Sequence, residues 1–204
     1  MDALVAAAPG AVPPPGLRRI PPAGVVPLGR AWSGNSVNCV PFRQSPLLRL
    51  PDGTDVASFF DADGQVVIAW PARTTPAGRA VIRNDRMPFD AHQAISLGRD
   101  PYGRIHVAFG AHNSTIRVSR SQGRDLRAGF SPAADLPEPP ATWGLDPRLT
   151  YPMFVRTARE LILLFRRGPH ADGALHVSRL DEFGAWQPDD LPIASGRLAV
   201  PSCG

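Results

Sequence analysis

Short apolar runs bounded by turn residues recur along the chain, and long stripes with a 3.6-residue period are missing. The clearest unit is "DVASFFDADGQVVIAWP", in which two apolar runs at 55–60 and 65–70 flank the turn at 61–64. The Asp-Gly pair in this turn supplies the positive backbone angle that a tight hairpin requires. The pattern therefore predicts an antiparallel β-hairpin.

Two later units carry the other predicted strands. Their strands are expected over 92–97, 104–109 and 115–120 in one unit, and over 151–156, 160–166, 174–180 and around Trp186 in the next. Meanders of three or four antiparallel strands are typical of propeller blades. The hairpin turns at Asp61 and Asp100 are 39 residues apart, near the blade repeat of roughly 40–50 residues. A sandwich of short strands gives a similar pattern, so that alternative stays open at this point.

The pattern divides the chain into two parts. Residues 1–30 predict an irregular, proline-rich leader, and residues 31–204 a single β-domain. The leader has an acid at position two and prolines within its apolar patch, which is not the order of a secretory signal. A further proline-rich stretch, "LPEPPATWGLDPR", predicts a long loop over one face. No apolar run reaches about eighteen residues, so we expect no membrane partner.

The charge pattern bears on the class of partner. The formal net charge is +4, and all 22 basic residues are arginine. A nucleic-acid-binding protein gathers its basic residues on one face or segment, whereas these are spread along the whole chain. We therefore expect no nucleic-acid partner. Acidic polysaccharide suits an arginine-lined cleft, because a guanidinium matches the geometry of carboxylate and sulfate.

The sequence carries few signals for cofactors or metals. Cys39 and Cys203 form neither a disulfide framework nor a metal motif. Gly-rich phosphate loops, a G-x-S-x-G elbow and an H-E-x-x-H helix are all missing from the sequence. We therefore expect no cofactor and no metal. A retaining glycosidase needs a close pair of carboxylates, and Asp90 and Asp146 are candidates that nothing singles out.

Histidines offer the clearest candidate chemistry. His92 in "DAHQAISL" is at the head of one predicted strand, and His112 in "GAHNST" follows just past the next, twenty residues later. That spacing is too long for a metal-binding helix pair but fits neighbouring strands that present both rings at one end of a sheet. His106 and His176 lie inside predicted strands and are expected to be half-buried residues that are hydrogen-bonded to a loop. His170 is expected to face solvent in a loop, with a place in the cleft as the alternative.

Six segments occur in an order that is informative: "GNSVNCVPFRQSPLL", "FFDADGQVVIA", "DAHQAISLGRDPYGRIHVAF", "AHNSTIRVSRS", "RLTYPMF" and "LLFRRG". Together they resemble the BNR-repeat proteins related to ulvan lyases, a family of seven-bladed β-propellers, over residues 32–195. The resemblance implies an all-β fold with four-stranded antiparallel blades. Such propellers need about twice this length to close the ring. The expectation is therefore an N-terminal half of about three to four blades, with open edges through which copies could associate.

The resemblance also implies a site. In lyases of this family, two histidines, a tyrosine and an arginine line the central cleft. By motif position the catalytic residues correspond to His92, His112, Tyr151 and Arg166. The residues expected to bind substrate are Asn38, Arg167 and His170, and Arg167 is also the alternative for the catalytic arginine.

The implied activity is cleavage of uronate-containing glycans by β-elimination. Removing the proton next to a carboxylate requires a cation to stabilise the developing charge, a base, and an acid for the leaving oxygen. Which of the two histidines and the tyrosine is base and which is acid stays open. A non-catalytic glycan-binding propeller or inert fragment, and a rhamnosidase- or sialidase-like glycosidase on the same scaffold, are the alternatives. Family members commonly act outside the cytoplasm, but the localisation of this chain stays open.

Overall fold

The computed structural model describes six segments of the chain. They comprise residues 26–39, 45–72, 77–137, 148–169, 172–189 and 192–194. The predicted leader falls almost entirely outside these segments, as do His170, Asp146, Cys203 and most of the predicted proline-rich loop. Among the described residues, no helix is long and apolar enough to span a membrane.

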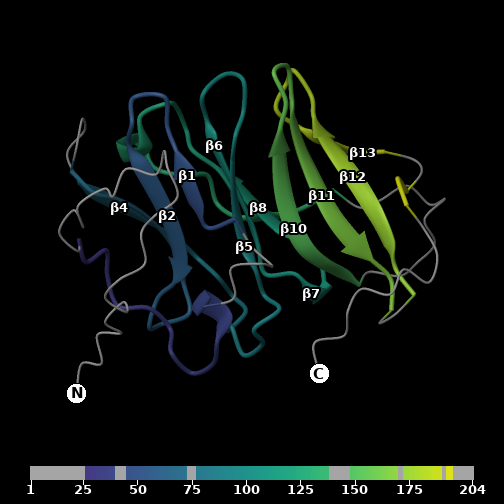
Figure 1. The fold of residues 1–204 in the computed structure, drawn as a ribbon, viewed down its shortest axis with the longest axis horizontal. Coiled ribbons are helices and arrows are strands. Elements are labelled where there is room, and N and C mark those ends of the chain that lie inside the picture. The colour runs from purple at the N-terminus through teal and green to yellow at the C-terminus, as the bar shows by residue number, and fades with distance from the viewer. Residues whose placement is uncertain are drawn as a thin grey trace, which may run out of the picture.

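The described residues form three antiparallel sheets, which stand side by side in chain order (Figure 1). The first sheet has the order β1-β2-β3-β4. Its strands are β1 (Leu47–Arg49), β2 (Asp55–Phe60), β3 (Val66–Trp70) and β4 (Gly78–Ile82). A short 3-10 helix, η1 (Val37–Cys39), precedes it. Consecutive strands pair with each other, so this sheet is a simple meander.

One strand, β7, lies in the chain between strands of the second sheet but pairs with the third sheet. The second has the order β5-β6-β8-β9, and the third has the order β13-β12-β11-β10-β7. The second sheet contains β5 (Ile95–Arg99), β6 (Ile105–Phe109), β8 (Arg117–Arg120) and β9 (Ala134–Asp135), with η3 (Leu126–Ala128) between its last two strands. The third contains β7 (His112–Ser114), β10 (Leu149–Arg156), β11 (Leu161–Arg167), β12 (Ala174–Leu180) and β13 (Trp186–Pro188). Strand β7 thus leaves its neighbours in sequence and pairs with β10.

The predicted all-β class is confirmed, and the predicted strands that flank the 61–64 turn are present as β2 and β3. The second unit differs at its start, because β5 begins at Ile95 and His92 lies in the turn before it. Strands β1, β4, β7 and β9 were not predicted. They are short or carry few buried residues, so their apolar periodicity is weak.

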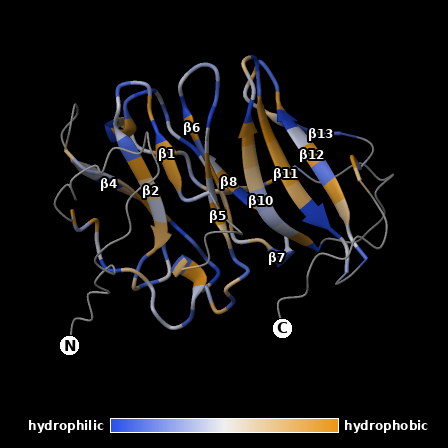
Figure 2. Cartoon of the chain, in the orientation of Figure 1, coloured by the Kyte–Doolittle hydropathy of each residue, from blue (hydrophilic) through white to orange (hydrophobic). Residues whose placement is uncertain are grey.

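Within the part of the chain that the structure describes, two hydrophobic clusters hold the sheets together. Cluster one joins the first and second sheets and is built around Phe60, Ile68, Trp70, Val107 and Phe109. Cluster two joins the second and third sheets and is built around Ala108, Ile116, Leu163, Phe165 and Trp186. Apolar residues accordingly colour the central strands in Figure 2, while the turns are hydrophilic.

Strand β6 contributes to both clusters because successive side chains of a strand point to opposite faces. Its residues are buried without exception. Val107 and Phe109 belong to cluster one, and Ala108 to cluster two. His106 points to the same face as Ala108, where its ring lies 5.6 Å from that of Trp186. A strand buried on both faces reads as a continuous apolar run, which is why "IHVAF" was predicted readily.

Gly98 on β5 allows the second and third sheets to approach closely. A Cβ atom at this position would lie 2.6 Å from Cγ of Phe154 on β10. We expect Gly98→Ala to lower the free energy of unfolding by about 1–3 kcal/mol, because overpacking forces neighbours out of their preferred rotamers. Chemical denaturation of this variant beside Gly123→Ala tests the expectation. At Gly123 the nearest atom to an added Cβ is 4.0 Å away, so equal losses in both variants would contradict the packing argument.

Three hairpins share an Asp-x-x-Gly turn, at Asp61, Asp100 and Asp181. Each glycine has a positive φ: 74° at Gly64, 92° at Gly103 and 83° at Gly184. In each turn the aspartate carboxylate also accepts a hydrogen bond from the backbone N–H four residues later, at 2.8–3.0 Å. The third turn was not among those predicted, although the same four-residue motif marks it.

Candidate functional site

The candidate site begins with a carboxylate that contacts two imidazoles. Asp90 Oδ1 lies against Nδ1 of His92, and Asp90 Oδ2 lies 2.6 Å from Nδ1 of His112. The two imidazole rings are stacked, with centroids 4.5 Å apart and planes 19° from parallel. Each of the three side chains is about one-third exposed. The structure therefore brings together the two histidines that the sequence singled out, and it adds Asp90 between them.

Local turns set this arrangement. The backbone N–H of His92 donates to Asp90 Oδ1 at 2.8 Å, an Asx turn that fixes the carboxylate just before β5. His112 begins β7, where it pairs with Thr150 of β10. The amide of Asn113 lies 3.3 Å from Nε2 of His112. One ring is therefore held by the second sheet's entry turn, and the other by the strand that joins the third sheet.

Tyr151 completes the cluster from β10. Its ring centroid lies 6.1 Å from that of His92. The pairing of β10 with β11 shifts between Thr150 and Met153, which is a bulge, and Tyr151 has a φ of 59°. Asn113, beside His112, has a φ of 51°. These are the two non-glycine residues with positive φ among the described residues, and both adjoin the histidine pair. Such strain costs of order 1–3 kcal/mol and gathers at functional sites.

Arg166 lies on the face that carries His112 but is engaged elsewhere. Thr150 pairs with His112 on one side and with Arg166 on the other, so the three side chains leave the sheet on one face. Two strand spacings, about 10 Å, separate Arg166 from His112. The guanidinium donates to the carbonyl oxygens of Gly168, at 3.1 Å, and Pro169. In this arrangement it secures the turn after β11.

Arg167 and Asn38 occupy structural positions. Arg167 is 7% exposed and lies on the same buried face of β11 as Leu163 and Phe165. Burial, and then the charge of Arg167, lower the pKa of nearby His176 to about 4. The Asn38 amide group donates to the carbonyls of Trp32 and Phe60 and accepts from the Phe60 N–H at 2.9 Å. Asn38 therefore fastens η1 to the end of β2.

One group of described residues has metal-binding chemistry. The donor atoms of Asp90, His92 and His112 lie within 4.8 Å of one another. A metal, however, binds imidazole along lone pairs in the plane of the ring. Planes only 19° from parallel and stacked at 4.5 Å direct those lone pairs side by side and not toward one point. The geometry fits a carboxylate that accepts a hydrogen bond from each ring, and it does not fit a metal ion bound by both rings.

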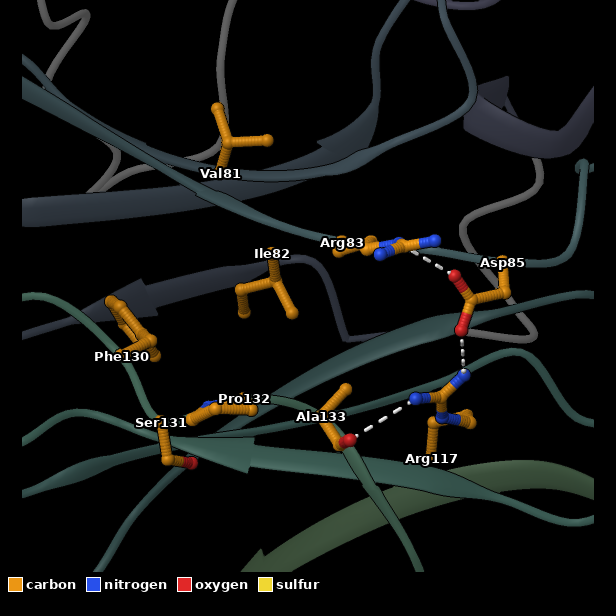
Figure 3. A pocket seen from close by; sticks show the side chains of 9 residues that line it. All are labelled: Val81, Ile82, Arg83, Asp85, Arg117, Phe130, Ser131, Pro132 and Ala133. Carbon is orange, nitrogen blue, oxygen red and sulfur yellow. Dashed lines mark hydrogen bonds and ion pairs between the residues drawn. The ribbon is translucent and has the colours of Figure 1, made fainter.

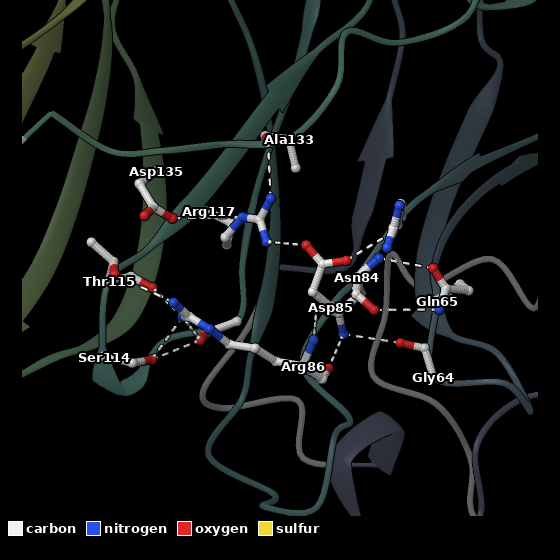
Figure 4. A network of polar contacts seen from close by, with 12 residues as sticks. Gly64, Gln65, Asn84, Asp85, Arg86, Ser114, Thr115, Arg117, Ala133 and Asp135 are labelled. Atoms are coloured by element: carbon white, nitrogen blue, oxygen red, sulfur yellow. Dashed lines mark hydrogen bonds and ion pairs between the residues drawn. The ribbon is translucent and has the colours of Figure 1, made fainter.

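Arg86 fixes the segment that bears His112. Its guanidinium donates to the carbonyl oxygen of Thr115 at 2.9 Å, to Ser114 Oγ at 3.1 Å and to the Gly110 carbonyl at 3.3 Å (Figure 4). Asn84 in turn holds the backbone of Arg86 and donates to the carbonyl of Gly64. A chain of hydrogen bonds therefore links the first sheet to β7, the strand that carries His112.

We expect Arg86→Met to lower the free energy of unfolding by about 1–3 kcal/mol, because several acceptors lose their charged donor. Amide hydrogen exchange should also accelerate at residues 112–115. Denaturation and exchange measurements check both effects. Arg83→Met is the matched control: the Arg83 side chain is 89% exposed and pairs with the exposed Asp85, so we expect no measurable change. Unaltered exchange at 112–115 in Arg86→Met would contradict the role.

A separate pocket of about 330 Å³ lies between β4 and the segment at 130–133. Its walls are mainly apolar (Figure 3), and none of the candidate residues lines it. At its rim, Asp85 pairs with Arg83 at 2.8 Å and with Arg117 at 3.2 Å. Arg117 also donates to the carbonyl of Ala133. Arg117 lies 3.6 Å from a second carboxylate, Asp135, so two carboxylates balance the two arginines. The pocket is therefore interpreted as a packing gap between two sheets and not as a ligand site.

Solved structures with a similar fold include an ulvan lyase described as a polysaccharide lyase of family PL25. It shares 17% identity and a TM-score of 0.52, over 71% of this chain and 36% of the lyase. The same values hold for that lyase bound to -[GlcA(1-4)Rha3S]-. An α-L-arabinofuranosidase from Lactobacillus brevis shares 11% identity with a TM-score of 0.48, over 72% of this chain and 52% of the enzyme. No curated protein matches the chain.

These findings define the class of protein as a β-propeller, of which the three sheets form part. The chain spans about a third of the lyase's length. Its family follows from the sequence: the profile of the BNR repeat-containing family matches residues 55–196, so the chain belongs to that family. The predicted fold class and the predicted family are both confirmed.

Proposed function

We propose that this protein acts on uronate-containing glycans, and that the cluster of His92, His112 and Tyr151 performs a β-elimination. The observation that carries the proposal is the stacked imidazole pair, 4.5 Å apart, with a tyrosine 6.1 Å from one ring. Support comes from the similarity to an ulvan lyase whose bound ligand contains glucuronate and sulfated rhamnose. An acidic polysaccharide is accordingly the proposed partner.

The chemistry needs two proton-transfer groups close together. A base removes the proton from the carbon next to the uronate carboxylate, and the bond from the adjacent carbon to the glycosidic oxygen breaks as a carbon–carbon double bond forms. The departing oxygen receives a proton from an acid. An unprotonated imidazole nitrogen suits the first task, and a phenol or second imidazole suits the other. The stack and Tyr151 provide three such groups within one cluster.

The carboxylate of the substrate requires a cation, and Arg166 is the proposed one. It leaves the sheet on the same face as His112. Its present bonds to the carbonyls of Gly168 and Pro169 would have to give way to a bidentate pair with the uronate. A bidentate pair between two opposite charges forms two parallel hydrogen bonds, which would replace the two bonds that the guanidinium gives up. His170 is proposed as a further contact to the glycan, whereas Arg167 and Asn38 keep the structural positions described above.

The direct test is the ultraviolet absorbance of the conjugated double bond formed by elimination. The full chain is incubated with ulvan, and in parallel with a neutral glycan that lacks uronate. The proposal expects a rising signal with ulvan alone. A flat signal with both glycans, from protein that is folded by circular dichroism, would contradict the proposed elimination.

A non-catalytic glycan-binding propeller is the second candidate. The observation that favours it is the engagement of the Arg166 guanidinium by main-chain carbonyls, which leaves the uronate charge without its cation in this arrangement. This candidate expects calorimetric binding of ulvan without release of an unsaturated product. A glycosidase on the same scaffold would instead release reducing ends without the ultraviolet signal.

A further inference from the structure

The position of Asp90 determines which ring nitrogen of His92 and of His112 carries the proton. Each of its two carboxylate oxygens faces a different imidazole, and in both cases the atom it faces is Nδ1. A carboxylate is an acceptor without a proton of its own, so each Nδ1 must carry the proton between the two groups. In a neutral imidazole with a proton on Nδ1, Nε2 is left as the acceptor.

A second contact points to the same tautomer independently. The Nδ2 group of Asn113 lies 3.3 Å from Nε2 of His112. An amide NH2 donates, so Nε2 of His112 must accept, and its proton is again on Nδ1. The left-handed backbone of Asn113, with φ at 51°, places this amide beside the ring.

The carboxylate itself is fixed and ionised. The backbone N–H of His92 donates to Oδ1 at 2.8 Å. Burial alone raises the pKa of Asp90, but the bond from this N–H and the two imidazoles outweigh burial and leave the pKa below its ordinary value. Asp90 therefore remains a charged acceptor near neutral pH, with its rotamer held by its own turn.

We infer that Asp90 is a positioning residue: it holds both His92 and His112 in the Nδ1–H tautomer, so that each Nε2 atom carries the lone pair of a base. At His112 a substrate proton would replace the Asn113 amide on that lone pair. The stack allows one carboxylate to serve both rings. Because the rings are 4.5 Å apart, their Nδ1–H groups are parallel, and each can donate to a different oxygen of Asp90. The role of Asp90 in catalysis rests on the proposed function, but its effect on the tautomers does not.

An isosteric change gives a specific expectation. Asp90→Asn replaces one oxygen by an NH2 group, which donates and cannot accept. The ring that faces the remaining oxygen should keep its proton on Nδ1. The ring that faces the new NH2 should transfer its proton to Nε2 and lose its accepting nitrogen there. A triad in which Asp is changed to Asn loses activity through the same error in tautomer.

The experiment uses the full chain labelled with ¹⁵N and long-range ¹H–¹⁵N correlation spectra of the imidazoles at neutral pH. The wild-type protein should show His92 and His112 both protonated at Nδ1, and Asp90→Asn should show one of them protonated at Nε2. Spectra of His92→Gln and His112→Gln assign the signals, and the buried His106 and His176 serve as internal references. Asp85→Asn is the matched control: its carboxylate pairs with Arg83 and Arg117, so the spectra should be unchanged.

Activity provides the second measurement. Under the proposed function, Asp90→Asn should lower kcat by at least about tenfold with little change in KM, because the substrate still binds while the base is wrongly protonated. Both rings protonated at Nε2 in the wild type, or both unchanged in Asp90→Asn, would overturn the inference whatever the activity. The expected tautomers in a protein that produces no unsaturated product would sustain the inference and overturn the proposed function.

Discussion

His112→Ala is expected to reduce the rate of unsaturated product formation by about 10²–10⁴-fold, the range typical for loss of a positioned proton-transfer group. The imidazole stacks on His92 and contacts Asp90, so its removal deletes one transfer group and exposes the other to water. The rate of ultraviolet signal growth with ulvan measures the effect. The His112 side chain is 28% exposed, and we therefore expect only a small change in stability.

Tyrosine variants provide the matched comparison for this experiment. Tyr151→Phe removes one hydroxyl from the cluster, whereas Tyr102→Phe removes one from a turn residue that is 52% exposed. The first should slow the reaction and the second should not. If His112→Ala cleaves ulvan at the wild-type rate, the assignment of proton transfer to this cluster is wrong.

Asp100→Ala is expected to lower the free energy of unfolding by about 3–5 kcal/mol, the cost of removing one member of a buried charge pair. Asp100 is 0% exposed. Its carboxylate accepts from the Arg104 backbone and guanidinium, both at 2.8 Å, and lies 3.1 Å from Nε2 of the buried His106. The variant would leave these donors without an acceptor. Urea denaturation with the linear extrapolation measures the loss.

The same cluster gives stability a dependence on pH. Burial alone raises the pKa of Asp100, but bonds from His106 and Arg104 outweigh it and hold the pKa far below the ordinary 3.8. A carboxyl group with a depressed folded-state pKa contributes stability above its unfolded pKa, and this contribution is lost as pH falls toward the folded value. The difference between wild type and Asp100→Ala should therefore shrink below about pH 4.

Asp181→Ala is the control for Asp100→Ala. Asp181 occupies the same position of the same four-residue turn, and it too accepts a hydrogen bond from the backbone N–H four residues later. Its surroundings are more exposed, and its carboxylate contacts Gln187 and not a buried histidine. We expect a clearly smaller loss. Equal losses in the two variants would show that the turn geometry, and not the buried pair, is responsible.

Strands were predictable where both faces are buried, or where buried and partly exposed residues alternate strictly. Strand β6 is buried on both faces, and β11 alternates from Leu161 to Arg167, so each produced a strong pattern. Strand β7 could not be predicted in this way. It has three residues, none fully buried, and its partner β10 lies more than thirty residues further along the chain. Pairing of that kind is decided by tertiary contacts, which leave little trace in local sequence.

The site was predictable in its residue types more than in its geometry. The motif order placed His92, His112 and Tyr151 in one cleft, and the structure brings their rings together. Asp90 was noted only as a carboxylate that nothing singled out, although it stands two residues before His92 in "DAHQ". Its role depends on an Asx turn that brings the carboxylate back against the following histidine. The bonds of Arg166 to the next turn likewise depend on how the chain bends after β11.

Because β7 pairs with the third sheet and not with its neighbours in sequence, duplication or deletion of a single sheet would disturb the histidine pair. Repeat proteins often diversify by duplicating, deleting or swapping whole units, because each unit contacts only its neighbours through a common interface. Here one imidazole enters from the turn before β5, while the other is carried by a strand that belongs to the next sheet. A recombination boundary placed between the second and third sheets would divide the pair. A rearrangement that moved one of these two units alone would therefore separate the two imidazoles.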